Sequence, residues 1–415
     1  MQLLPCVVRG LRTTPLALAV LAASAQVSPS GAPALRAAAD AAWQRAVQAA
    51  EAEGQALRAD ASRVAAAGLL PAPPAIELSH RNERWTDRAP GAGRETELAA
   101  ALPLWTPGQR AARATAADAE AASARAALHF ARWQIAGQVR ELAWRIASAR
   151  AELRHAMARQ EALERLAADV DRRVKAGDLA RADALAARAE ALSARGQAAE
   201  AQWQLDTAER DWAAQVALPV PEPAQMEEAL PTGAGRLDLE QHPQLQLAMR
   251  QLELAQRQQA AVAADRRDPP ELLLRYRQET AGTDAGTRNS VGVGLRIPLG
   301  TDARNRPLDA AAASAALVAQ RQLEAARLQL VSALKQAQDA HAAAARRLSA
   351  ARERAALERE RAALVQRAFD AGEYGLPDLL RALAASAAAQ ADLERTQAAL
   401  GLARARLLQA QGLTP

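Results

Sequence analysis

The chain has 415 residues, and its 52 basic and 47 acidic residues give a formal net charge of +5. These charges are interleaved rather than gathered into blocks of one sign, which argues against a nucleic-acid-binding protein. Half of the residues are apolar but only 3% are aromatic, and most of the apolar ones are alanine, so the composition favours long, closely packed helices over a conventional compact core.

Residues 1–25 are predicted to form a secretory signal peptide. Arg9 and Arg12 supply its charged region, residues 15–23 its apolar segment, and an A-x-A cleavage pattern ends it. The apolar segment is too short for a membrane-spanning helix. Cys6, the single cysteine of the chain, precedes this segment, so we expect a mature chain without disulfide or thiol chemistry.

A helix over residues 34–68 and a strand hairpin over about residues 75–105 are predicted next. Prolines from Pro71 onward end the helix. The first strand alternates two sets of side chains from Ile76 onward, and the return strand covers residues 95–105. Strands of about ten residues cross a bilayer when tilted in a barrel. The alternative is a surface hairpin on a helical protein, which would need a sheet partner to be stable in water.

A long helical hairpin is predicted over about residues 108–216. Residues 110–174 contain no proline, and apolar or small side chains recur there at coiled-coil spacing. A helix of this length would extend about 90 Å. It is expected to end at Gly177, after which a second helix over residues 181–216 returns beside the first.

A proline-rich linker over residues 217–236 separates this first half from a second half. The first half covers residues 26–216 and the second half residues 237–412. The second half is predicted to contain a helix, then a strand hairpin and a long helical hairpin, at about residues 271–299 and 303–410.

Matching sequence markers indicate that the second half duplicates the first. Gly177 and Gly372 lie in similar segments and are 372 − 177 = 195 residues apart. Pro103 and Pro298 have the same separation, 298 − 103 = 195. This period is far too long for a solenoid repeat, so we expect two copies of one structural unit.

The sequence carries no pattern typical of a catalytic or metal site. Its five histidines are dispersed, with no pair at i, i+4, which disfavours a zinc site. Residues 292–297 have two glycines of a dinucleotide-binding loop but lack the third and lie in an expected strand. We therefore expect no enzyme activity, no cofactor and no resident metal.

In this order of elements the chain resembles the outer-membrane efflux duct family of the TolC type, over essentially its whole mature length. The markers are the prolines at 71–74, Glu-Thr-Glu-Leu at 95–98, Leu-Pro-Leu-Trp at 102–105, Gly-Gln-Arg at 108–110 and the two Ala-Gly turns. The resemblance implies an α+β membrane protein. Three protomers would combine four strands each into a closed 12-stranded barrel, since 3 × 4 = 12, and their helices would form a periplasmic tunnel.

The resemblance also implies function and partners. A homotrimer in the outer membrane of a Gram-negative bacterium would contact lipid and conduct substrate passively from an inner-membrane pump, of the resistance-nodulation-division type, and its periplasmic adaptor. The short loops and the 95–98 strand look most like the heavy-metal branch, which favours metal cations as cargo. Drug efflux and type I protein secretion are alternatives. A periplasmic adaptor and a structural coiled-coil protein are alternatives of another class.

Candidate site residues follow from the same resemblance. The family's tip turns meet the adaptor and pump, and an aspartate after each turn narrows the closed end. A second ring aspartate of the family corresponds to Arg381 here, a departure that allows an Asp378–Arg381 pair in place of a purely acidic gate. Helix capping is the alternative role for the aspartates. The predicted gate residues are Asp183, Asp378 and Arg381, and the tip turn residues are Gly177, Asp178, Gly372, Glu373 and Tyr374.

Aromatic side chains at the membrane interface are few. Trp85, Trp105 and Tyr276 are the residues expected to contribute to an interfacial girdle.

Overall fold

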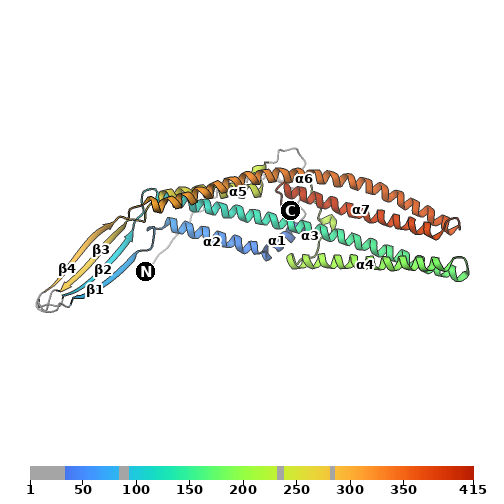
Figure 1. Cartoon of the computed structure of the whole chain (residues 1–415), viewed down its shortest axis with the longest axis horizontal. Helices are drawn as coiled ribbons and strands as arrows, with labels where there is room; N and C mark the ends of the chain where they lie inside the picture. The colour runs from blue at the N-terminus through green and yellow to red at the C-terminus, as the bar shows by residue number, and fades with distance from the viewer. Residues whose placement is uncertain (1–32, 84–92, 231–237, 281–285) are drawn as a thin grey trace, which may run out of the picture.

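The structure, a computed structural model, describes residues 33–83, 93–230, 238–280 and 286–415. The molecule is elongated, with a sheet at one end and long helices running to the other (Figure 1). The predicted signal peptide, part of the linker and Trp85 lie outside the described residues.

The first half contains two short helices, two strands and two long helices: α1 (Pro33–Arg45), α2 (Val47–Ala67), β1 (Ala75–Glu83), β2 (Gly93–Pro103), α3 (Gln109–Ala176) and α4 (Arg181–Gln215). The single helix predicted over residues 34–68 is therefore divided. Ala46 adopts an extended conformation between α1 and α2 and packs with Trp43 against a cluster of buried side chains. The division therefore accompanies tertiary packing, and no proline or glycine marks it in the sequence.

The second half repeats this order after two short 3-10 turns: η1 (Pro223–Gln225), η2 (Leu239–Gln241), α5 (Pro243–Ala264), β3 (Glu271–Thr280), β4 (Thr287–Arg296), α6 (Asp302–Asp370) and α7 (Leu376–Ala410). The return strands end at Pro103 and Arg296, earlier than the expected ends at 105 and 299, because a proline at 103 or 298 cannot donate to a strand ladder. Helix α6 begins before Pro307, which lies near its start and removes few hydrogen bonds there.

The four strands form one antiparallel sheet in the order β1-β2-β3-β4. Each hairpin is local, whereas the β2–β3 pair joins the two halves of the chain. Leu98 of β2 lies opposite Leu78 of β1 and Tyr276 of β3. The outer edges of β1 and β4 have no strand partner within the part of the chain that is described.

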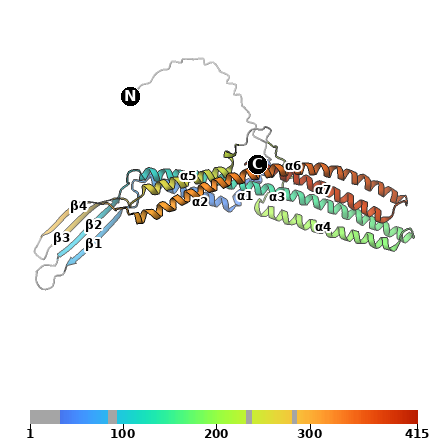
Figure 2. The same ribbon diagram turned by 45° about the horizontal axis from the view of Figure 1, so that its top comes forward.

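The helices α3 and α6 have 68 and 69 residues, which corresponds to about 100 Å each. Each pairs with the shorter helix that follows it, α4 or α7, and both helical hairpins turn at the end far from the sheet (Figures 1 and 2). Most of their buried residues are alanine, which lets helix backbones approach closely. None of the described helices combines the length and apolar character needed to span a membrane.

Larger buried side chains gather midway along the body, where α1, α3, α4 and the linker meet. Leu35, Ile146, Trp212 and Met226 belong to this cluster. Beside it, the Arg140 guanidinium of α3 donates to both carboxylate oxygens of Glu228 in the linker, at 2.8 and 2.6 Å. This contact attaches the linker to the middle of α3.

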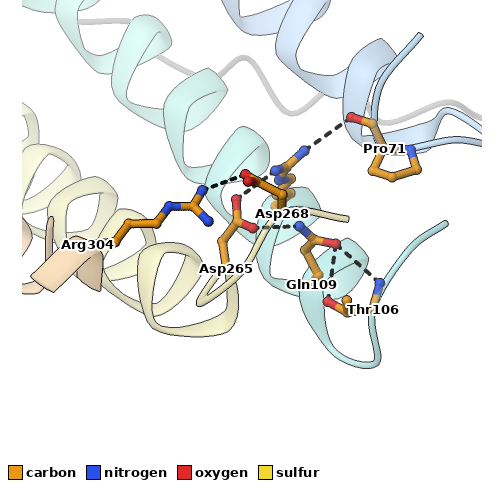
Figure 3. Close-up of polar contacts among 7 residues, drawn as sticks. Pro71, Thr106, Gln109, Asp265, Asp268 and Arg304 are labelled. Atoms are coloured by element: carbon orange, nitrogen blue, oxygen red, sulfur yellow. Dashed lines mark hydrogen bonds and ion pairs between the residues drawn. The ribbon is translucent and has the colours of Figure 1, made fainter. Parts of the chain in front are cut away.

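A polar network joins the sheet end to the helices (Figure 3). Asp265, just after α5, accepts hydrogen bonds from Gln109 at 2.8 Å and Arg113 at 2.7 Å, both near the start of α3. Arg304 of α6 donates to Asp268 at 2.6 Å. Gln109 and Arg304 are 304 − 109 = 195 residues apart. The duplicated positions thus hold the α5–β3 connection from both halves.

Candidate functional site

One face of the sheet is uncovered, and the three rows of it that lie nearest the helices are apolar. Its side chains form rows across the four strands, such as Ile76, Ala100, Leu274 and Val293. Ile76 is 79% exposed and Val291, one row away, is 80% exposed. No described helix packs on this face (Figure 1). We refer to it as the apolar face; its large residues are Ile76, Leu78, Leu98, Leu102, Leu272, Leu274, Tyr276, Val291, Val293 and Leu295.

The opposite face carries charge, and we refer to it as the charged face. Arg277 contacts Glu95 at 2.9 Å, and Arg275 contacts Glu97 at 3.6 Å, in both cases between β3 and β2. Glycine, alanine and serine occupy many of the remaining positions of this face. The period of two along each strand produces this division, because successive side chains point to opposite faces.

The sheet has the surfaces of an incomplete assembly. An exposed apolar face of this size is unusual on a monomer in water, and two unpaired strand edges are open to pairing with another chain. An apolar environment would cover the exposed face, and neighbouring strands at both edges would provide hydrogen-bond partners for the unpaired backbone groups.

The far end of the molecule carries two turns of the same geometry. Gly177 and Gly372 have left-handed φ values of 90° and 79°, which an L side chain would disfavour. The amide of Asp178 donates to the Arg173 carbonyl at 2.9 Å, and the amide of Glu373 donates to the Ala368 carbonyl at 2.8 Å. Both are six-to-one helix-ending bonds.

The predicted gate residues lie directly after these turns. Asp183 is in the first turn of α4, and its carboxylate accepts from the backbone amide of Ala180 at 3.2 Å. Asp378 is in the first turn of α7 and pairs with Arg381 at 2.9 Å. In the single chain both aspartates therefore make local contacts: Asp183 caps its helix, and Asp378 forms the ion pair that the departure at Arg381 allowed.

The two tips are held together by contacts that the sequence did not indicate. Val170, Phe369, Leu376 and Leu379 form a buried cluster shared by both helical hairpins. The Arg173 guanidinium lies 4.9 Å from the Phe369 ring centroid and 3.6 Å from the Asp370 carboxylate. Arg173 thus links the end of α3 to the end of α6.

An ionic seam runs along α3 and α7, also unpredicted. The two helices are antiparallel, and in each ion pair the two residue numbers add up to 547 or 548. The register between the helices is therefore constant. The pairs are Glu141–Arg406 at 2.9 Å, Glu152–Arg395 at 3.0 Å and Arg154–Glu394 at 2.9 Å. The sequence alone could not identify these pairs, because the helices carry dozens of interleaved charges and the sequence does not show which helices are in contact.

The predicted aromatic residues occupy unlike positions. The Trp105 indole N–H donates to the Gly68 carbonyl at 3.1 Å, at the junction between sheet and helices. Tyr276 lies midway along β3 on the apolar face, and the next row of that face toward the loops contains the polar residues Gln278 and Asn289. Its role in an interfacial girdle stays a prediction. Trp85 is outside the described residues.

No described group of three or more histidine, cysteine, aspartate or glutamate side chains is arranged to hold a metal ion. The arrangement that the structure presents is a two-faced sheet on a long helical body.

Solved structures share this architecture over nearly the full chain. The outer membrane protein VceC of Vibrio cholerae has a TM-score of 0.74 at 17% identity, covering 93% of this chain and 99% of that one. CusC, described for transmembrane channel formation, has a TM-score of 0.75 at 17% identity, with coverages of 94% and 95%. The CmeC outer membrane channel of Campylobacter jejuni has a TM-score of 0.73 at 14% identity, with coverages of 91% and 85%.

Sequence comparison adds no relative, since neither a family model nor a curated protein matches the chain. The structural likeness shows that the chain has the fold of outer membrane channels. The resemblance inferred from the sequence is confirmed at this level, as is the mostly helical architecture with one small antiparallel sheet.

Proposed function

We propose that this protein is the outer-membrane channel of an efflux system and conducts substrate passively. The observation that carries the proposal is the four-stranded sheet with an uncovered apolar face, a charged opposite face and two open edges. Three chains would join β4 of one to β1 of the next and close a 12-stranded barrel. The apolar face would then contact outer-membrane lipid and the charged face would line water.

The helical hairpins support the second part of the proposal, a tunnel through the periplasm. At about 100 Å, α3 and α6 are far longer than globular helices. Their tips, at the opposite end from the sheet, would meet a periplasmic adaptor and an inner-membrane pump. In this proposal the energy for transport would come from the pump, and the channel would supply only the path.

Metal cations are the cargo favoured by the resemblance to the heavy-metal branch, and drugs are the alternative. Deleting the gene and measuring growth across a panel of metals and drugs separates them. If the channel exports metal ions, the deletion strain should become more sensitive to particular metal ions and not to drugs, and restoring the gene should restore growth. Sensitivity confined to organic drugs would contradict metal export and leave the channel proposal standing.

We further propose that Asp183 and Asp378 narrow the closed tip. Both lie directly after the tip turns, half-buried and in matching positions, 378 − 183 = 195 residues apart. Replacing both with alanine should raise ion conductance in planar bilayers, because a ring of side chains and the Asp378–Arg381 pair are removed. Asp118→Ala, on α3 near the sheet end, is the control. Unchanged conductance of the double variant would exclude the two residues from the gate.

A periplasmic adaptor or structural coiled coil is the rival class. Heat-resistant trimers in the detergent-extracted outer-membrane fraction support the channel, whereas a soluble periplasmic monomer would refute it.

A further inference from the structure

We propose that the charges facing the lumen of the barrel cancel row by row within each chain, so that this part of the duct admits ions of either sign equally. The inference rests on the proposed channel and deepens it by stating that the barrel does not select its cargo by the sign of the charge. It concerns the five rows of the charged face that lie between Glu271 and Glu279 of β3.

Strand register places the charges of this face in rows that cancel. The row of Arg275 contains Glu77, and the row of Arg277 contains Glu97. The row of Glu279 contains Glu95 and two arginines, Arg81 and Arg288. The row of Glu271 contains Arg296, and the row of Leu273 has no charged residue. Each row therefore sums to zero.

Contacts between rows support the cancellation. Arg277 lies 2.9 Å from Glu95 and 3.8 Å from Glu279. Arg296 lies 3.3 Å from Glu271 within one row. Opposite charges directly across neighbouring strands stabilise the pairing, as at Glu97–Arg277 and Glu271–Arg296. Glu95 and Glu279 also lie directly opposite each other, and their shared contacts with Arg277 offset this repulsion. Each row would occur three times in a trimer, so any uncompensated charge in a row would also be present three times in the lumen. Neutral rows avoid this accumulation of charge.

Small residues keep the charged side chains open to the lumen. Gly292 and Ala99 flank Arg275 in its row, and a methyl group added at Gly292 would meet only the Cβ of Arg275, at 4.0 Å. The side chains of Arg275 and Arg277 are half-exposed. They face the space through which cargo would pass.

The apolar face shows a contrasting pattern. Among its described strand positions the only arginine, lysine, aspartate or glutamate is Arg94, at the row nearest the loops. Over the five rows considered, the charged residues therefore lie on one face and cancel there.

Cysteine modification tests the proposal without requiring an open tip. Ser290 faces the lumen in the row of Arg277, and its neighbour Val291 faces the opposite side. Each is replaced by cysteine in a Cys6→Ser background, in trimers reconstituted into phosphatidylcholine vesicles. Modification rates are measured with a cationic and an anionic methanethiosulfonate of similar size, relative to a free thiol.

The expected result is a Ser290→Cys rate ratio within about threefold of the free thiol, because no net potential acts on either reagent. Adding Arg277→Gln should favour the cationic reagent by about tenfold, and adding Glu97→Gln should favour the anionic one by a similar factor. Arg275→Gln and Glu77→Gln, one row away, repeat the comparison if either variant fails to form trimers.

A strongly skewed ratio in the parent, or ratios that no charge variant changes, would overturn the inference. Failure of the underlying channel gives a different outcome. Val291→Cys should resist both reagents because lipid covers it; if it reacts as fast as Ser290→Cys, the barrel itself is refuted.

Discussion

At the scale of single residues, the guanidinium of Arg140 organises the middle of the molecule. Arg140 is 1% exposed and Glu228 is 5% exposed. The same guanidinium donates to Gln409 at 2.7 Å and to the Leu413 carbonyl at 2.8 Å. Helix α3, the linker and the carboxyl-terminal segment therefore converge on one buried charge, whose hydrogen-bonding capacity is well satisfied.

Breaking this ion pair should destabilise the protein strongly. Glu228→Ala leaves a buried cation without its partner, which typically costs about 3–5 kcal/mol. We expect a clearly lower denaturant midpoint for this variant. The exposed pair Arg63–Asp118 supplies the control, because Asp118→Ala removes a contact worth at most about 1 kcal/mol. Equal midpoints for the two variants would contradict the anchoring role of Glu228.

His242 is expected to make a pH-dependent contribution to the free energy of unfolding. Its Nδ1 accepts from the Gln244 amide at 3.2 Å and caps α5. Burial lowers the pKa of His242 below its usual 6.5, and the nearby Gln409 carbonyl opposes this in part. Because the unfolded chain binds the proton more readily, stability is complete above pH 6.5 and decreases as the pH falls through the lowered pKa.

The corresponding measurement is the thermal transition between pH 7.5 and pH 5. His242→Asn keeps a capping acceptor but does not titrate, so its transition should change less over this range than that of the parent. A parent and variant with the same slope would show that His242 is not the source of the dependence.

Where the repeat supplied a second copy, the sequence predicted the positions of individual residues, although the gate role of Asp183 and Asp378 stays a prediction. Asp183 and Asp378 were found because each follows a matching glycine at a matching distance. Arg140, Arg173 and His242 were not found, since their partners come from distant segments. Arginine is among the commonest charged residues of these helices, and no local feature distinguishes a buried one.

At the scale of elements, close approach of α3 and α7 depends on glycine. A methyl group added at Gly401 would collide with the indole ring of Trp144. Trp144 lies in the buried mid-body cluster, so the ring has little freedom to move. Gly401 is thus a packing requirement between the two helical hairpins, alongside their ionic seam.

Gly401→Ala should therefore destabilise the protein, although alanine is ordinarily better than glycine in a helix by about 0.5–1 kcal/mol. Overpacking costs about 1–3 kcal/mol, so the net effect is a loss. Gly54→Ala in α2 is the matched control, because nothing lies within 4 Å of its added methyl group, and it should raise the apparent melting temperature. A Gly401→Ala protein as stable as the Gly54→Ala protein would contradict the close contact.

Element type was predictable because the periods are clear: two along the strands around Ile76 and Val291, and three to four along α3. The ends of the elements and the pairing of distant strands were harder to predict. The division at Ala46 accompanies tertiary contacts, and the β2–β3 pair joins Leu98 to Tyr276, which are 276 − 98 = 178 residues apart. Local sequence carries no record of such a pairing.

At the scale of the whole molecule, the two ends expose different kinds of surface. The sheet end presents an apolar face and open edges, whereas the helical end presents exposed turns of identical geometry. The alanine-rich body connects them and positions the sheet through the Asp265 network. A single chain leaves the apolar face and the two strand edges of the sheet without partners, and closure of three copies into one barrel would supply them.

Electron cryo-microscopy of the protein extracted from the outer membrane tests this claim most directly. The expected assembly has three chains, with β4 of each paired to β1 of the next and the face containing Ile76 and Val293 turned toward the detergent or lipid belt. A monomer, or an assembly in which these strand edges stay open and the apolar face packs against helices, would contradict it.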